Sequence, residues 1–238
     1  MPAGRPDQRR AAAFFDVDGT LVQTTIVHYY VYFRRKRMSH LWGRLWYGAY
    51  LLKCVYYLAL DRIDRSRLNI AFYRSYAGLQ ADEIKGQAAD CYRDVIRPRR
   101  FVEAAACVNE HRQAGRHIVL VSGSLDFLIE PLAAECGQAS VVAASLVESD
   151  GRFTGHLKSA PLGDEEKARR VREFAVANEI DLSQSYAYGD SITDLPMLLT
   201  VGNPNAVNPD RALAAVAKAR DWPLHRWTIE GPRGGNGR

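Results

Sequence analysis

The sequence predicts an α/β protein in which a Rossmann-like parallel sheet has helices on both faces and carries an all-helical cap after its first strand. Three observations support this fold class. Short apolar runs alternate with helical stretches on either side of residues 24–96, and within that segment no strand-like alternation occurs. The composition, 47% hydrophobic and 25% charged in 238 residues, is ordinary for a folded protein and excludes global disorder.

The predicted strands and helices follow one another along the chain. The apolar runs that predict strands are residues 11–15, 117–121, 141–147 and 185–189. Helical stretches occupy residues 97–114, 125–136, 164–178 and 210–219. Residues 148–155, ESDGRFTG, contain an Asp-Gly turn and predict a small hairpin. Strands that alternate with helices form parallel sheets, because each helix carries the chain back across the sheet.

Residues 24–96 differ in composition from the rest of the chain. They hold 12 Lys and Arg against 6 Asp and Glu, which is the whole basic excess of the protein. They also hold 14 of its aromatic residues, of which there are 12 Tyr, 8 Phe and 4 Trp in total. We therefore expect residues 24–96 to form a separate, inserted module of three or four helices, and residues 1–23 and 97–238 to form the core domain.

Cysteine spacing and the N-terminal residues bear on the cellular compartment of the protein. The cysteines at positions 54, 91, 107 and 136 have neither CxxC nor zinc-site spacing, which predicts buried free thiols and a reducing compartment. The first ten residues are polar and basic. The apolar run after them breaks at Asp16, which is too short for the core of a signal peptide. We expect a cytoplasmic protein.

Two carboxylates mark the end of the first predicted strand, in the segment Asp16-Val17-Asp18-Gly19-Thr20. Strand alternation puts Asp16 and Asp18 on one side, and Gly19 lets the backbone turn where the strand ends. Open α/β sheets bind ligands at the carboxyl ends of their strands. A solvated turn or a calcium loop is the alternative, but the apolar run before the motif and the lack of further spaced acids argue against it.

A second group of small polar residues, Ser122-Gly123-Ser124, follows the predicted strand 117–121 and precedes a predicted helix. The N–H groups and the positive dipole end at a helix N-terminus attract anions, and a Ser hydroxyl adds a donor. The same tripeptide also serves as an ordinary helix cap. An anion site here therefore depends on the motifs around it.

A third group, Gly189-Asp190-Ser191-Ile192-Thr193-Asp194, follows the predicted strand 185–189. Mg²⁺ takes one or two carboxylates together with phosphate oxygens and water, so two acids at a strand end suit this cation. Asp194 also fits as a helix N-cap before Leu195-Pro196, which is compatible with a role at a metal site.

Lys167 lies near the start of the predicted helix 164–178. If Asp164 caps this helix, Lys167 is in its first turn and its side chain leans toward the helix N-terminus. A solvated helix face is the alternative for a Lys that follows two Glu residues.

In this order and spacing, the four groups resemble the motifs of the haloacid-dehalogenase-like (HAD) phosphohydrolase superfamily. The segment Asp16–Thr20 is similar to its first motif, Ser122 to the second, Lys167 to the third and Asp190–Asp194 to the fourth. The phrases SGSLDFLIEPLA, SYAYGDSITDLPML and AVNPD resemble subfamily IB, the phosphoserine-phosphatase-like branch. The helical insertion between the first and second motifs looks like the type-1 cap of that superfamily.

The resemblance implies a Mg²⁺-dependent phosphomonoester phosphatase, a phosphoric monoester hydrolase that forms an aspartyl-phosphate intermediate. Asp16 would attack phosphorus, and Asp18 would protonate the leaving oxygen and then activate the hydrolytic water. Mg²⁺ would be held by Asp16, the backbone carbonyl of Asp18 and Asp190. Asp18 argues against dehalogenation, because members with that chemistry lack the second Asp.

The resemblance also implies a phosphate site and a supporting set of residues. Ser122, Gly123 and Lys167 would bind the substrate phosphate, and they would offset the repulsion between the attacking carboxylate and the phosphate dianion. Thr193 and Asp194 would support the metal motif.

Two positions bear on the substrate. Phosphoserine phosphatases have Glu nine residues after the nucleophile, where it helps to hold the substrate's ammonium, and this chain has Thr25. No acid occurs between Gly19 and Leu60, and Thr193 stands where the amino-acid phosphatases usually have Asn. Because a buried ammonium without a counter-ion is costly, we expect a small-molecule or lipid-linked phosphate as substrate, with phosphoserine as the alternative.

The basic, aromatic cap is compatible with a peripheral contact with an anionic membrane, at the inner membrane surface. Residues 34–37 are Arg-Arg-Lys-Arg, and residues 45–60 are apolar apart from Lys53, which is shorter than the roughly 20 residues that a membrane span needs. A helix in the interface, with Trp42 and Trp46 at headgroup depth, fits this pattern. Alternatively, the aromatic residues form the core of the cap or a dimer face.

Nucleic acid is a third partner that a basic, aromatic surface could bind. We rank it below lipid, because four contiguous basic residues spread around a helix. The alternative from another functional class is a non-catalytic module that binds membranes or nucleic acid.

Overall fold

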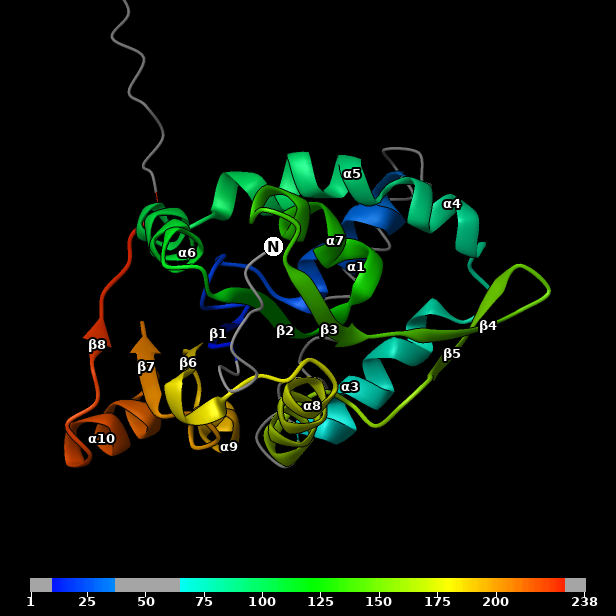
Figure 1. Cartoon of the computed structure of the whole chain (residues 1–238). Helices are drawn as coiled ribbons and strands as arrows, with labels where there is room; N and C mark the ends of the chain where they lie inside the picture. Colours follow the sequence, from blue (N-terminus) through cyan, green and yellow to red (C-terminus); the bar gives the residue numbers. More distant parts are fainter. Residues whose placement is uncertain (1–9, 37–64, 230–238) are drawn as a thin grey trace, which may run out of the picture.

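A six-stranded parallel sheet forms the centre of the computed structural model, which describes residues 10–36 and 65–229 (Figure 1). The strand order is β3-β2-β1-β6-β7-β8. The strands are β1 (Ala12–Asp16), β2 (His117–Leu125), β3 (Ser140–Ala144), β6 (Tyr186–Gly189), β7 (Asn203–Val207) and β8 (Leu224–His225). The α/β fold class predicted from the sequence is confirmed.

Strand β1 lies at the centre of the sheet between β2 and β6, and every one of its residues is buried. Ala13 and Phe15 belong to the core on one face, whereas Ala12 and Phe14 belong to the core on the other. This explains why the first four residues of β1 are all apolar rather than alternating. Helices α6 (Val102–Gln113) and α7 (Asp126–Glu135) lie on one side of the sheet, and α8 (Asp164–Ala177), α9 (Leu195–Leu198) and α10 (Arg211–Ala219) on the other (Figure 1).

The described segments between β1 and β2 are helical. They contain α1 (Ile26–Lys36), α3 (Arg65–Tyr73), α4 (Ala81–Gly86), α5 (Ala88–Cys91) and a π-helical turn over Tyr92–Ile96, with short 3₁₀ turns at Arg74–Tyr76 and Arg97–Arg99. Most of their large aromatic side chains are buried, whereas Tyr32 is half-buried. Those at most 6% exposed are Tyr29, Tyr30, Phe33, Phe72, Tyr73 and Tyr76. For these residues the interpretation as core of the cap is correct. The division into core and cap domains remains our proposal.

Part of the membrane prediction lies outside the described residues. This part comprises Arg37, Trp42, Trp46, Lys53 and the apolar run 45–60. Cys54 is also outside them. No helix in the described ranges 10–36 and 65–229 is long and apolar enough to cross a membrane.

The antiparallel hairpin predicted at residues 148–155 is present as β4 (Leu146–Ser149) and β5 (Arg152–Leu157). It packs on the segment that joins α3 to α4: the Gly78 amide donates to the Phe153 carbonyl (2.8 Å), and the Phe153 amide donates to the Leu79 carbonyl (3.0 Å). The single strand predicted over 141–147 is wrong, because the chain leaves the sheet at Ser145, whose hydroxyl donates to Asp126.

Strands β7 and β8 have no apolar signature and were not predicted from the sequence. β7 reads NPNAV, with polar residues at its first half, and β8 has only two residues. β7 pairs in parallel with β6 and with β8, and β8 is the edge strand, with β7 as its one neighbour. Their formation depends on the sheet that is already in place.

The described cysteines are free thiols, as predicted. Cys91 and Cys136 are buried and Cys107 is half-buried. Burial raises the pKa of Cys91 to about 12 and that of Cys136 to about 11. These two thiols therefore stay protonated and unreactive near neutral pH.

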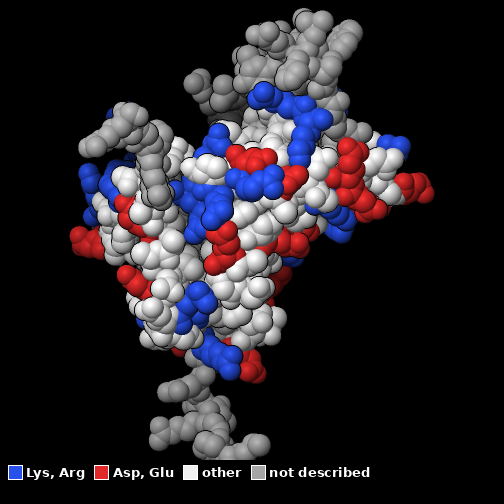
Figure 2. All heavy atoms as spheres, turned by 90° about the horizontal axis from the view of Figure 1, so that it is seen from above, with Lys and Arg blue, Asp and Glu red and all other residues white. Residues whose placement is uncertain are grey.

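Basic and acidic side chains are interspersed on the face that Figure 2 shows, which is the view from above α4 to α7. Asp90 of α5 illustrates this mixing, because it pairs with Lys36 (2.6 Å) and with Arg93 (2.8 Å). Such exposed pairs are worth little in stability, but they reduce the local excess of positive charge.

Candidate active site

Asp16 is the last residue of β1, where the strand reaches the carboxyl edge of the sheet. It is 4% exposed and lies beside Val121 of β2. Burial raises the pKa of Asp16 to about 6, against the lowering influence of the neighbouring ammonium of Lys167. The fold thus places a poorly solvated carboxylate at the position where open α/β sheets bind ligands.

The sharp turn after β1 requires glycine. Gly19 has φ +101°, which favours glycine over any residue with a side chain. A Cβ atom at Gly19 would lie 2.2 Å from Oδ2 of Asp190. The glycine therefore allows the turn and also makes room for the carboxylate of Asp190.

Lys167 joins two buried carboxylates. Its ammonium donates to Oδ1 of Asp16 (2.5 Å) and to Oδ1 of Asp194 (2.6 Å). Burial opposes the charge on Lys167, yet the two carboxylates raise its pKa above the usual value, so it remains an ammonium. The prediction that Asp164 caps this helix is wrong: Gly163 is the N-cap and Asp164 is the first helical residue, but Lys167 does lie in the first turn.

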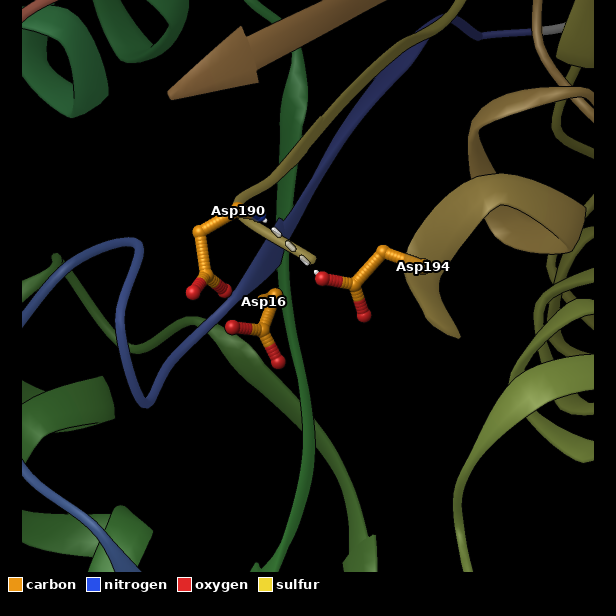
Figure 3. A group of neighbouring side chains, drawn as sticks. All are labelled: Asp16, Asp190 and Asp194. Carbon is orange, nitrogen blue, oxygen red and sulfur yellow. Dashed lines mark hydrogen bonds between the residues drawn. The ribbon is translucent and has the colours of Figure 1, made fainter. Parts of the chain in front are cut away.

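Asp190, directly after β6, and Asp194, the last residue of the 3₁₀ turn Ile192–Asp194, lie beside Asp16 (Figure 3). One carboxylate oxygen from each of the three residues lies within 4.8 Å of the other two. Oδ2 of Asp194 accepts hydrogen bonds from the backbone amides of Asp190 and Ser191 (3.2 Å each). Since Oδ1 of Asp194 is bound to Lys167, both oxygens of Asp194 already have donors, and this side chain acts chiefly to hold the loop in place.

The acidic cluster fits a hard divalent cation. Oδ2 of Asp16 is buried and has no hydrogen-bond partner, which is costly for a carboxylate oxygen unless an external cation or donor meets it. Asp190 is close to it, and its Oδ1 accepts a hydrogen bond from the Thr20 hydroxyl (3.3 Å). Asp16 and Asp190 could therefore hold Mg²⁺, and a backbone carbonyl, phosphate oxygens or water would complete its shell.

Asp18 is surrounded by hydroxyl groups. Oδ1 accepts from Tyr29 (2.6 Å) and Thr24 (2.8 Å), and Oδ2 accepts from Ser124 (2.6 Å) and Ser122 (3.3 Å). Burial raises the pKa of Tyr29 well above its usual value, so this phenol keeps the proton that it donates. These four donors orient the Asp18 carboxylate.

Thr24 and Tyr29 were not predicted as site residues from the sequence, and Ser124 was predicted only as part of the Ser122-Gly123-Ser124 group, without a contact to Asp18. Ser124 lies two residues after Ser122, so it projects from the same side of a strand, and that spacing could have identified it. Thr24 and Tyr29 carry no such signal, because their contact with Asp18 depends on the position of α1.

The Ser122-Gly123-Ser124 segment is placed near Asp18, but not in the predicted turn. It lies within β2, whose register with β3 shifts between Ser122 and Leu125, and α7 begins only at Asp126. The predicted turn at the helix N-terminus is therefore wrong, whereas phosphate binding by Ser122 and Gly123 remains a prediction. Gly123 lines the cavity above the acids, and its carbonyl accepts from the Tyr73 hydroxyl (2.5 Å).

A cavity of about 550 Å³ opens above these side chains. The predicted site residues that line it are Asp16, Asp18, Gly123, Lys167, Asp190, Thr193 and Asp194. Thr193 donates to the Ser191 hydroxyl (3.2 Å), so it supports the loop. Thr25 also lines the cavity, and its hydroxyl lies 2.9 Å from Nδ1 of His28.

Comparison with known proteins agrees with this arrangement. The model of the haloacid dehalogenase-like hydrolase family matches residues 13–199. An inhibition of morphological differentiation protein from Streptomyces azureus is 37% identical over 90% of this chain and 78% of its own length. A probable phosphatase from Mycobacterium tuberculosis is 33% identical, over 94% of this chain and 77% of its own. A phosphoserine phosphatase from the same organism is 28% identical, over 94% and 73%.

Solved structures show the same fold. A protein of unknown function from Bordetella pertussis superposes with a TM-score of 0.78 at 27% identity, covering 92% of this chain and 99% of its own. A phospho-aspartyl intermediate analogue of phosphoserine phosphatase has a TM-score of 0.67 at 17% identity, with 94% and 96% covered. The family match includes all four motifs and extends over most of the chain. This protein therefore belongs to the haloacid dehalogenase-like hydrolase family.

Proposed function

We propose that this protein is a Mg²⁺-dependent phosphomonoester hydrolase that works through an aspartyl-phosphate on Asp16. The observation that carries the proposal is the floor of the cavity. There, Asp16 is bound by Lys167 through one oxygen, and its other oxygen is buried beside Asp190 without a partner. The family to which the chain belongs, and the phosphatases among its relatives, support this reaction class.

In the first step, a carboxylate oxygen of Asp16 forms a bond to phosphorus and the bond to the alcohol oxygen breaks. Asp18 gives its proton to that oxygen. The hydroxyl groups of Tyr29 and Ser124, which donate to its two carboxylate oxygens, keep Asp18 oriented for this role as general acid.

In the second step, the ionised Asp18 accepts a proton from water, which attacks phosphorus and releases Asp16 and inorganic phosphate. Lys167 stays charged throughout and offsets the negative charge on Asp16 and on the phosphoryl group. Mg²⁺ held by Asp16 and Asp190 would supply further charge stabilisation to the phosphoryl oxygens.

The test uses p-nitrophenyl phosphate with the intact protein. Hydrolysis should require added Mg²⁺ and stop with a chelator. Asp16→Asn should lower the rate by about a thousandfold or more, which corresponds to about 4 kcal/mol of barrier. A chelator-resistant activity, or an Asp16→Asn variant at the parent rate, would contradict the proposal.

Asp18→Asn tests the covalent intermediate. This variant lacks the base for the second step, so intact-mass spectrometry after mixing with substrate should show one added phosphoryl group. The mapped modification should be on Asp16. If the variant hydrolyses substrate within the mixing time but no phosphorylated protein is detected, water attacks phosphorus directly.

Phosphoserine hydrolysis is the second candidate. The 28% identical phosphoserine phosphatase from Mycobacterium tuberculosis favours it. Thr25 opposes it, because it lines the cavity at the position expected for an ammonium-binding acid and its hydroxyl is turned to His28. We expect the specificity constant for phosphoserine to fall below that of other phosphomonoesters, and a value at least tenfold above all others tested would establish the second candidate.

A further inference from the structure

The cavity is larger than a phosphate group requires. Its volume of about 550 Å³ falls in the range of about 300–1,000 Å³ that is typical of small-molecule sites. Apolar side chains form much of its walls: Ile26 and Val27 from α1, Leu68 and Phe72 from α3, and Leu162 from the segment before α8. These walls face the part of a substrate that leaves with the alcohol oxygen.

Asn69 of α3 places a neutral amide in these walls. It is 8% exposed and lines the cavity, and among the described residues its side chain has no hydrogen-bond partner. Its amide faces the cavity and is therefore an available donor and acceptor for a ligand. A Cβ atom on Gly123 would lie 3.9 Å from its Nδ2, which puts the amide beside the predicted phosphate motif.

Charged groups in the cavity are confined to its floor. Within residues 10–36 and 65–229, the charged lining side chains are Asp16, Asp18, Lys167, Asp190 and Asp194. The one cation among these, Lys167, is already bound by two carboxylates. A leaving group with an ammonium and a carboxylate would bury both against apolar walls, and an unpaired buried charge costs several kcal/mol.

From these three features we infer the substrate class, and the inference rests on the phosphatase function proposed above. The substrate is a phosphomonoester of an uncharged, mainly apolar alcohol that carries one neutral hydrogen-bonding group near the phosphate. Its apolar part packs on α1 and α3, and its polar group, such as an ester or a hydroxyl, binds the amide of Asn69. Asn69 is thus a specificity-determining residue.

The test compares kcat/KM of the parent protein, with Mg²⁺, for three soluble esters. 1-Hexanoylglycerol 3-phosphate has an ester and a hydroxyl beside an apolar chain, hexyl phosphate lacks these groups, and O-phospho-L-serine carries two charges. We expect hexanoylglycerol phosphate to be best and to exceed phosphoserine at least tenfold. Phosphoserine as the best of the three overturns the inference, whereas failure to hydrolyse these esters and p-nitrophenyl phosphate overturns the proposed function with it.

Asn69→Leu tests the amide directly, because leucine is similar in size but has no polar atoms. The ratio of kcat/KM for hexanoylglycerol phosphate to that for hexyl phosphate should fall at least tenfold. Asn69→Gln, which keeps the amide, should retain part of the ratio and also serves if the leucine variant folds poorly. Ile70→Leu is the matched control, since Ile70 is the next residue of α3 and is 43% exposed. An unchanged ratio in a folded Asn69→Leu protein overturns the assignment of Asn69.

A second comparison distinguishes a lipid substrate from a soluble metabolite of the same chemistry. 1-Oleoylglycerol 3-phosphate in phosphatidylcholine vesicles is compared with the hexanoyl ester in solution, at equal accessible concentration. A preference for the vesicle ester supports a lipid substrate, and equal or faster hydrolysis of the soluble ester supports a soluble metabolite of the same chemistry. Hydrolysis of phosphoserine faster than both overturns the substrate class.

Discussion

Lys167, Asp16 and Asp194 form a buried ion triad with two carboxylates and one ammonium. Their side chains are at most 8% exposed, so water screens these charges poorly. Breaking such a group by removing one member is far more costly than losing a surface pair, because it leaves charge buried without compensation. The triad holds the strand end of β1 and the loop after β6 together around the candidate metal position.

Lys167→Met should therefore lower the free energy of unfolding as well as activity. We expect a loss of about 3–5 kcal/mol, because Asp16 and Asp194 then lie buried without a cation. Urea denaturation in the presence of a chelator measures it. The control, Lys218→Met, changes an exposed lysine of α10 and should stay within about 0.5 kcal/mol of the parent. A loss below about 1 kcal/mol for Lys167→Met would contradict the role of the triad.

His111 is a buried imidazole of α6, away from the candidate site. Its Nε2 lies 2.8 Å from the Tyr188 hydroxyl, and its Nδ1 lies 3.3 Å from the guanidinium of Arg116. Since arginine only donates, Nδ1 is the acceptor and the imidazole is neutral. Burial, followed by the nearby charge of Arg116, lowers the pKa of His111 to about 4.

This lowered pKa makes part of the stability dependent on pH. Between about pH 6.5 and pH 4 the unfolded chain binds a proton at His111 and the folded protein does not, so the free energy of unfolding falls as the pH falls through this window. The contribution is about 3 kcal/mol at most. His111→Gln should show a smaller loss of stability between pH 7 and pH 4.5 than the parent or an exposed-site control, His156→Gln. If the free energy of unfolding depends on pH in the same way in the parent and in both variants, the prediction is wrong.

At the scale of single elements, β1 and its turn decide where the acids lie. The strand is buried on both faces, and the chain reverses at Gly19 so that Asp18 meets α1 and Asp190 meets Asp16. The turn thus links the end of the central strand to the helical segment and to the loop after β6.

Gly19→Ala should damage the site through this turn. The positive φ alone costs an alanine about 1–2 kcal/mol, and its Cβ would also collide with Asp190. We expect a lower free energy of unfolding. We also expect the Mg²⁺ concentration that p-nitrophenyl phosphate hydrolysis requires to rise at least tenfold.

Gly115→Ala is the control that separates the cost of the positive φ in Gly19→Ala from the collision with Asp190. Gly115 has φ +72° but no atom within 4 Å of its Cβ position. It should lose similar stability while keeping the Mg²⁺ requirement of the parent. Equal Mg²⁺ requirements in the two variants would show that the contact with Asp190 is unimportant.

At the scale of the whole molecule, the positive charge is unevenly distributed along the chain. The chain carries a net charge of +5, and the basic excess lies in residues 24–96. The described part of that segment, residues 24–36 and 65–96, holds eight Lys and Arg against four Asp and Glu, which is most of the basic excess, although Lys36 is paired with Asp90. We therefore predict that the basic residues of 24–96, with residues 34–37 among them, bring the protein to an anionic membrane.

Vesicle sedimentation checks this prediction. Attraction to an anionic leaflet is worth about 1 kcal/mol per basic residue and decays over about 8 Å at physiological salt. The parent protein should sediment with anionic vesicles more than with neutral ones, and less as salt rises. Replacing residues 34–37 by Ser should weaken this binding while p-nitrophenyl phosphate hydrolysis continues at the parent rate. If the parent sediments with neither kind of vesicle, the membrane prediction is wrong.

The sequence by itself determined the parallel sheet and the acids at its edge. Apolar strands that alternate with helices must align in parallel, and parallel strands bring their carboxyl ends to one edge. For that reason Asp16, Asp190 and Asp194 could be predicted to meet, and Lys167 at the start of α8 to reach them. The assignment to subfamily IB and the role of each residue in catalysis remain predictions.

Only the tertiary structure decided what surrounds these acids. Ser124 and Asp18 are 106 positions apart in the chain, and Tyr29 reaches Asp18 only because α1 is packed above the turn. Asn69 belongs to no sequence motif, and only its position in the lining of the cavity identifies it as a candidate substrate contact. Local patterns fix strands and helices because they depend on neighbours along the chain, whereas hydrogen bonds between distant side chains depend on how those elements pack, and no periodicity in the sequence records that.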